Sequence, residues 1–162
     1  MPALQGLLRR SDARVLRQAV AALAGIDDPA AARAVQTILR AATGATRAAV
    51  VDALVAEKDP RVVPMLMRIL DESDPFGDDH QTVLDTLGAV EQLADERAIP
   101  AVVATMRKKK LFTRRKARAF KIASVQALRA MATPKAKAAL DDASRTGDRL
   151  LKRIVRDARR TA

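Results

Sequence analysis

Apolar and polar residues alternate along the chain at the three-to-four-residue spacing of amphipathic helices. Four stretches repeat one pattern, in which an apolar residue precedes an Asp or Thr by five positions. Asp and Thr accept hydrogen bonds from the free N–H groups of a starting helix, and Pro, which follows three of the four, is favoured at the first helical position. Each stretch therefore ends one helix and begins another. The pairs are Leu23 and Asp28, Leu54 and Asp59, Val90 and Asp95, and Leu128 and Thr133, so that successive caps lie 31, 36 and 38 residues apart.

The helices on either side of these turns have matching faces. Two positions before each turn hold small or β-branched residues, which let neighbouring helices approach closely. Seven positions past each cap comes an apolar residue on the helical stripe that would face the core. These positions are Ala19, Val50, Thr86 and Ser124, then Ala22, Ala53, Ala89 and Ala127, and after the turns Val35, Leu66, Val102 and Leu140.

We interpret residues 1–162 as a single solenoid domain, in which stacking buries each unit's apolar stripe against its neighbours. Residues 2–10 read like the second helix of a preceding unit, so they form either an N-terminal cap or the end of a longer array. Residues 148–160 would close the far end. The expected helices span residues 3–10, 13–25, 29–42, 45–57, 61–72, 78–93, 97–110, 115–131, 135–145 and 148–160.

Several segments resemble the HEAT-repeat family of two-helix units. Residues 12–23 (DARVLRQAVAAL) carry the pattern of a first helix, and residues 59–64 (DPRVVP) and 95–100 (DERAIP) are close to the bacterial D-P-R-A-I-P form of a second helix. The resemblance extends over nearly the whole chain. It implies an all-α, right-handed α-solenoid of about four helical hairpins with end-capping helices. It also implies a binding or scaffolding role, without naming the partner.

Composition supports the all-α fold and removes several kinds of site. Apolar residues make up 49% of the chain but aromatic residues only 2%, and a core of small aliphatics suits packed helices better than a sheet. The chain has no Cys, and His80 is its one histidine, which excludes disulfides and the usual zinc sites.

We expect no enzyme activity, no cofactor and no small-molecule substrate. The sequence contains no Gly-rich phosphate loop, and its serines have no plausible base partner. Some HEAT-like solenoids are DNA glycosylases that hold a damaged nucleotide with aromatic residues and a carboxylate. This chain has no Trp or Tyr to form such a site.

The sequence predicts neither a membrane span nor a signal peptide. No apolar run approaches the roughly 18 residues that span a bilayer. The first ten residues lack the basic-then-apolar order of a signal peptide. We therefore expect a soluble, cytoplasmic protein.

Charge is distributed unevenly. The net charge is +11, yet residues 1–100 carry 11 Lys/Arg against 15 Asp/Glu, whereas residues 101–162 carry 19 against 4. Nine of the fifteen residues 107–121 are basic, more than the macrodipole of a helix end requires. The last helix adds a basic outer face opposite an apolar stripe. Regular stacking would place this basic face and residues 107–121 at the same end of the molecule. The candidate partner-binding residues are Arg107, Lys108, Lys109, Lys110, Arg114, Arg115, Lys116 and Arg118, followed by Arg149, Arg153 and Arg156.

Within the basic segment we expect Leu111 and Phe112 to pack against the solenoid and Phe120 to belong to its core.

Residues 71–80 (DESDPFGDDH) form a second departure from the repeat. Their spacing does not match a calcium loop, so we expect a solvated turn in which Asp78 or Asp79 caps the next helix and His80 is exposed.

Four interpretations of the basic end stay open from the sequence: a solubilising face, a site for an acidic protein partner, a site for nucleic-acid phosphates and a contact with an anionic membrane. Scarce aromatic residues argue against single-stranded nucleic acid. We favour a protein partner with an acidic surface, bound by the concave face of the second helices and by the basic end. Non-specific binding of double-stranded nucleic acid is the alternative.

Overall fold

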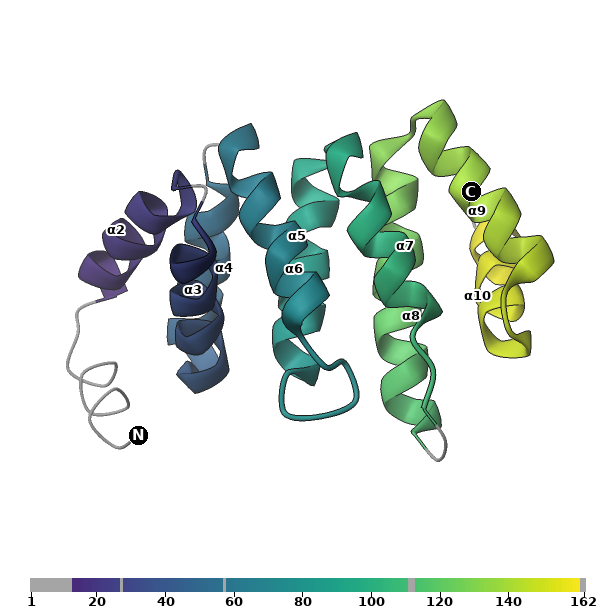
Figure 1. Cartoon of the computed structure of the whole chain (residues 1–162), viewed down its shortest axis with the longest axis horizontal. Helices are drawn as coiled ribbons and strands as arrows, with labels where there is room; N and C mark the ends of the chain where they lie inside the picture. Colours follow the sequence, from purple (N-terminus) through teal and green to yellow (C-terminus); the bar gives the residue numbers. More distant parts are fainter. Residues whose placement is uncertain (1–12, 27, 57, 111–112, 161–162) are drawn as a thin grey trace.

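The structure is a computed structural model that describes residues 13–26, 28–56, 58–110 and 113–160. In this part of the chain all regular elements are helical (Figure 1). They are α2 (Ala13–Ala24), α3 (Pro29–Ala41), α4 (Gly44–Val55), the 3-10 helix η1 (Pro60–Val62), α5 (Val63–Glu72), α6 (His80–Leu93), the 3-10 helix η2 (Glu96–Ala98), α7 (Ile99–Arg107), α8 (Arg114–Met131), α9 (Pro134–Thr146) and α10 (Arg149–Arg160).

Consecutive helices pair into hairpins that follow one another along the long axis of the molecule (Figure 1). The first helices α2, α4, α6, α8 and α10 pack on one another as one layer, and the second helices α3, α5, α7 and α9 form the other. The described residues thus form a HEAT-like α-solenoid, which confirms the predicted fold class. The predicted helix over residues 3–10 lies outside the described residues.

The helix starts follow the predicted capping pattern. The side chains of Asp28, Asp59 and Asp95 each accept a hydrogen bond from the backbone N–H two residues later, and Thr133 accepts one from Ala136. Short side-chain acceptors satisfy N–H groups that the first helical turn leaves free. The four turns predicted from the sequence are therefore confirmed.

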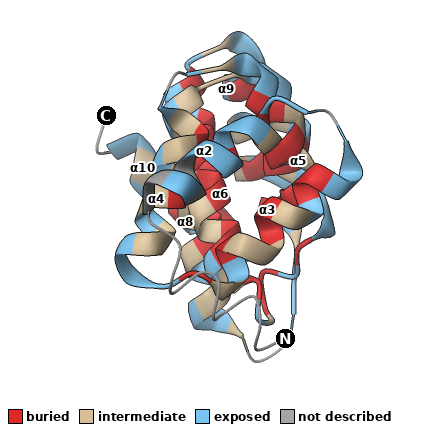
Figure 2. Cartoon of the chain, turned by 90° about the vertical axis from the view of Figure 1, so that its left-hand side faces the viewer, coloured by how far each residue is buried: buried red, intermediate tan, exposed pale blue. Residues whose placement is uncertain are grey.

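The buried hydrophobic residues form one cluster from α2 to α10. Seen from the N-terminal end, buried residues lie on the inner sides of the helices (Figure 2). Val35, Leu66 and Val102, predicted to face the core, are fully buried, whereas Leu140 is half-buried. The positions before each turn that hold small or β-branched residues are buried or half-buried in α4, α6 and α8. In α2 the corresponding residues Ala19 and Ala22 are exposed.

The turn at residues 73–79 is not the solvated loop expected from its sequence. Phe76 is buried and its ring meets Phe120 edge to face, with centroids 5.3 Å apart. Asp79 occupies the cap position of α6, but its carboxylate accepts a hydrogen bond from Arg40 at 2.8 Å instead of capping the helix. His80 is half-buried, with Nδ1 2.9 Å from the carbonyl oxygen of Pro75. The expectation of a solvated turn fails because Phe76 packs against Phe120 in the core. The expectation of a side-chain cap fails because the Asp79 carboxylate accepts from Arg40 and from the backbone N–H of Asp74.

Phe120 is fully buried, as predicted for a core residue. Leu111 and Phe112 lie outside the described residues. The helix predicted over residues 97–110 ends at Arg107, which leaves Lys108, Lys109 and Lys110 in the connection to α8.

Candidate partner-binding site

The basic segment 107–121 begins at the end of α7 and continues through a connection into the first turns of α8. Its side chains fall into two groups in the structure. One group is bonded to the protein itself, and the other points to the surface without a partner among the described residues.

Two lysines of the first group hold the turn 73–79 against the next hairpin. The ammonium of Lys108 donates to the carbonyl oxygens of Leu70 and Ser73, at 3.1 and 2.9 Å. The ammonium of Lys116 donates to the carbonyl oxygens of Phe76 and Gly77, both at 3.0 Å. These carbonyls lie in the last turn of α5 and in the turn that follows it, and of the four only Gly77 also accepts a backbone N–H of a described residue, that of His80. Both lysines therefore contribute to stability.

Burial lowers the pKa of Lys108, against the raising effect of the nearby carboxylates Asp71 and Asp74. The basic segment and the acidic turn of the preceding unit thus complement one another. Part of the positive charge that the sequence leaves unexplained is balanced inside the molecule.

Other cations of the segment pair with carboxylates. Arg107 forms an ion pair with Asp142 across to α9, and Lys110 lies 3.9 Å from Asp74. Lys121, whose side chain is 1% exposed, donates to Asp148 at 2.7 Å.

Asp148 begins α10, and its other carboxylate oxygen accepts from the N–H of Leu151 at 2.8 Å. Partial burial acts to raise the pKa of Asp148, but the hydrogen bonds from Lys121 and Leu151 and the charges of Lys121 and Lys109 outweigh it. The pKa of Asp148 therefore lies below its ordinary value.

The second group includes Arg114, Arg115 and Arg118, and further exposed cations outside the segment lie on the same first-helix layer. Arg114, Arg115 and Arg118 on α8, and Arg149 on α10, form no side-chain hydrogen bond or ion pair with described residues. Lys152, which belongs to the basic face predicted for the last helix, and Arg129, which the sequence did not single out, are also exposed and form no side-chain hydrogen bond or ion pair with described residues. Arg153 and Arg156 share Asp157, at 3.7 and 3.9 Å.

These cations form one surface because α8 and α10 pack side by side. The sequence of α8 contains six Lys/Arg and no Asp/Glu, and that of α10 contains six against one. We call this surface the α8–α10 basic surface; its exposed members are Arg114, Arg115, Arg118, Arg129, Arg149, Lys152, Arg153 and Arg156.

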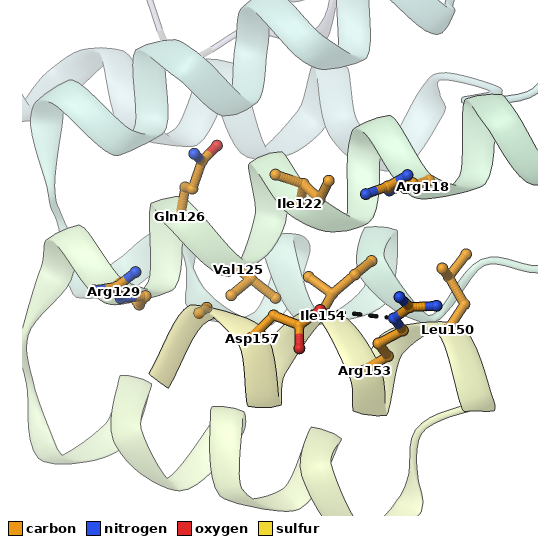
Figure 3. Close-up of a pocket in the computed structure, with 10 residues that line it drawn as sticks. Arg118, Ile122, Val125, Gln126, Arg129, Leu150, Arg153, Ile154 and Asp157 are labelled. Atoms are coloured by element: carbon orange, nitrogen blue, oxygen red, sulfur yellow. Dashed lines mark ion pairs between the residues drawn. The ribbon is translucent and has the colours of Figure 1, made fainter. Parts of the chain in front are cut away.

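A groove of about 360 Å³ lies between the two helices within this surface (Figure 3). Ile122 and Val125 of α8 and Leu150 and Ile154 of α10 form its apolar floor. A second hollow of about 310 Å³ shares Leu150 and is lined by Lys108, Lys109, Lys110, Arg114 and Lys121, so the groove continues toward the basic connection.

The sequence did not reveal this groove. The sequence feature that could have indicated the groove is in α8: two aliphatic residues lie between two arginines on one helix face, in the series Arg118, Ile122, Val125 and Arg129. That this face opens beside α10 depends on how the hairpins stack.

Over the described ranges, no three His, Cys, Asp or Glu side chains come together in a way that could hold a metal ion. In the same residues no helix combines the length and apolar character needed to cross a membrane.

Comparison with protein families supports the predicted fold. The family model described as HEAT repeats matches residues 1–84, just over half of the chain. No curated protein and no solved structure matches the chain.

Proposed function

The chain belongs to the HEAT-repeat family, whose members generally mediate protein–protein interactions or scaffolding, and on this premise we propose that it is a non-catalytic module that docks an acidic protein partner. The α8–α10 basic surface is the proposed docking site. The match extends over residues 1–84 and says nothing of this surface, so the proposal depends on the residues of α8 and α10 themselves.

The observation that carries the proposal is the set of unpaired arginines on α8. Arg114, Arg115 and Arg118 have no acidic neighbour within their own helix, and no described carboxylate reaches them. Like charges this close repel one another, and a partner's carboxylates relieve that repulsion. The planar guanidinium also accepts a carboxylate in a bidentate hydrogen-bonded pair.

A single exposed ion pair contributes about 0–1 kcal/mol, so one arginine is not a binding site. Several cations on one face act together. They raise the local concentration of an acidic partner and accelerate its association, in a manner that salt screens.

The concave face of the second helices stays a prediction. The exposed side chains of this layer include Arg33 on α3, Asp71 and Glu72 on α5, and Lys137 on α9, which carry charges of both signs. They form no surface comparable to that of α8 and α10.

Double-stranded nucleic acid is the second candidate. The absence of any Asp or Glu from α8 favours it, because phosphate neutralisation by Lys and Arg gives binding that does not depend on sequence. Binding of either ligand weakens with salt, so the two candidates are separated by which ligand binds, an acidic peptide or duplex DNA.

The test compares an oligoglutamate peptide with a duplex DNA by fluorescence anisotropy, at about 50 mM and about 200 mM salt. The variant Arg114→Glu/Arg115→Glu/Arg118→Glu reverses three charges on the α8–α10 basic surface. The matched control, Arg33→Glu/Lys137→Glu/Arg145→Glu, reverses three exposed and unpaired charges on the second-helix layer.

We expect the wild type and the control to bind oligoglutamate alike and the α8 variant to bind at least about tenfold more weakly, a difference of about 1.4 kcal/mol. Equal losses in both variants would contradict the assignment to α8. Binding of duplex DNA without binding of oligoglutamate would favour the second candidate and overturn the first.

A further inference from the structure

The groove between α8 and α10 combines an apolar floor with a cationic rim. Ile122, Val125 and Ile154 lie between the two helices, and Arg118 and Arg129 stand at its two ends on α8 (Figure 3). Arg153 of α10 lies on the opposite side, near Leu150. An arrangement of this kind is suited to a ligand that is itself apolar on one side and anionic on the other.

The charges at the rim of the groove predict that the ligand carries negative charge. The guanidinium groups of Arg118 and Arg129 have no partner among the described residues, and the one carboxylate in the groove lining, Asp157, is already shared by Arg153 and Arg156. The rim therefore carries an excess of positive charge.

We infer that this groove receives one acidic amphipathic helix of the partner, with its aliphatic side chains on the floor and its carboxylates at Arg118, Arg129 and Arg153; the inference rests on the proposed function. The distance along α8 from Arg118 to Arg129 is about 16 Å at 1.5 Å per residue, which a helix of about three turns covers.

The chemistry of the floor favours a helical occupant over an extended one. An extended segment leaves its own backbone N–H and C=O groups without partners over an apolar floor, where each unpaired group is costly. The flanking elements are helices, whose backbone groups bond within each helix, so they offer no sheet edge for an added strand. A helix satisfies its own backbone and presents apolar side chains along one face.

The size of the groove argues against duplex nucleic acid as its occupant. A space of about 360 Å³ between two packed helices is of the size that small ligands or a few side chains fill. Phosphates would contact the rim arginines and leave the aliphatic floor exposed to water.

The test uses two synthetic peptides of identical composition. In the first, Leu residues follow helical spacing on one face and Glu residues occupy the other; in the second, the same Leu residues are distributed around the helix. Both carry the same total charge, so a difference in affinity reports the segregation of apolar and acidic residues on two faces; the Ile122 variants then test the apolar floor. Binding to the full chain is followed by fluorescence anisotropy.

We expect the amphipathic peptide to bind at least about tenfold more tightly than the permuted one, as burial of a single aliphatic side chain suffices for that ratio. Ile122→Asn should remove the preference, whereas Ile122→Val should preserve it. The double variant Arg118→Glu/Arg129→Glu should weaken binding of the amphipathic peptide at least about tenfold, while the control Arg33→Glu/Lys137→Glu, also exposed, should leave it unchanged. Thermal melting of each variant separates loss of binding from loss of fold.

The outcomes distinguish this inference from the proposed function. Equal affinity for both peptides, with binding still weakened in Arg118→Glu/Arg129→Glu, overturns the helix-in-groove inference and leaves docking of acidic proteins in place. Failure of oligoglutamate and of both peptides to bind overturns both. Tight binding of the amphipathic peptide that is indifferent to Ile122 and Arg129 places it elsewhere and also overturns the inference.

Discussion

Replacing Asp148 by Ala should destabilise the C-terminal end of the solenoid more than its exposed position suggests. One carboxylate oxygen of Asp148 accepts from the ammonium of Lys121 at 2.7 Å, and the other accepts from the N–H of Leu151 at 2.8 Å. The Lys121 side chain is 1% exposed, whereas that of Asp148 is 28% exposed. The variant therefore leaves a buried ammonium without its carboxylate and removes the cap of α10.

The two losses can be given separate magnitudes. Loss of an N-cap side chain costs about 1 kcal/mol. Breaking a buried ion pair from one side costs about 3–5 kcal/mol, and the partial exposure of Asp148 places this pair near the lower end. The total is about 4 kcal/mol, which for a chain of 162 residues lowers Tm by about 8–16 °C.

Calorimetry of a short variant series tests the reasoning. Asp148→Ser keeps a capping oxygen and should lose only the part that comes from the ion pair. Adding Lys121→Met to Asp148→Ser should recover most of that loss, because an apolar side chain then fills the buried position. A loss of less than about 1 kcal/mol in Asp148→Ala, or no recovery in the double variant, would refute the account of this pair.

Three further outcomes are expected, each measured by the change in the unfolding transition. Lys116→Met should lose about 1–3 kcal/mol because it leaves the carbonyl of Phe76 without its donor and removes one of the two donors to Gly77, whereas its neighbour Arg115→Met should stay within about 0.5 kcal/mol of wild type; similar losses would show that Lys116 contributes no more than a surface charge. Phe120→Ala should cost about 3–5 kcal/mol in urea titrations, since the ring is fully buried, and a loss below about 1 kcal/mol would contradict its place in the core. Because the folded pKa of Asp148 lies below its ordinary value, its contribution is present at neutral pH and is lost as the pH falls below about 4, so the Tm difference between wild type and Asp148→Asn should shrink in acid; a constant difference would be inconsistent with that pKa.

The features that could be predicted from the sequence are those with local causes. Asp59 and Thr133 cap helices by bonding to backbone groups two or three residues away, so the residue types alone predict the turn. Likewise, the period of the apolar positions depends on helix geometry alone, and Leu66 and Val102 are buried as that period requires.

The features that could not be predicted depend on residues far apart in the chain. The sequence presents Lys108 and Lys116 as equivalent to Arg115, yet their ammonium groups bond to carbonyls 35 to 40 positions earlier. A solvated turn and a turn held by Phe76 against Phe120 have the same composition. The relative placement of hairpins decides which cations stay free.

The same limit applies to the candidate site. The sequence predicted a basic end, but it could not show that Ile122 and Ile154 meet across two helices to form a groove floor. Arg129 went unnoticed because it lies outside the dense basic segment, eleven residues along α8 from Arg118.

The central claim is that a partner docks on the outer side of α8 and α10. Chemical-shift mapping of the isotope-labelled chain during titration with the acidic amphipathic peptide tests it most directly. We predict that amide shifts concentrate between Arg118 and Arg129 and between Leu150 and Ala158, with α3 and α5 unaffected. Shifts centred on the second-helix layer, or spread evenly over every cation, would contradict the claim.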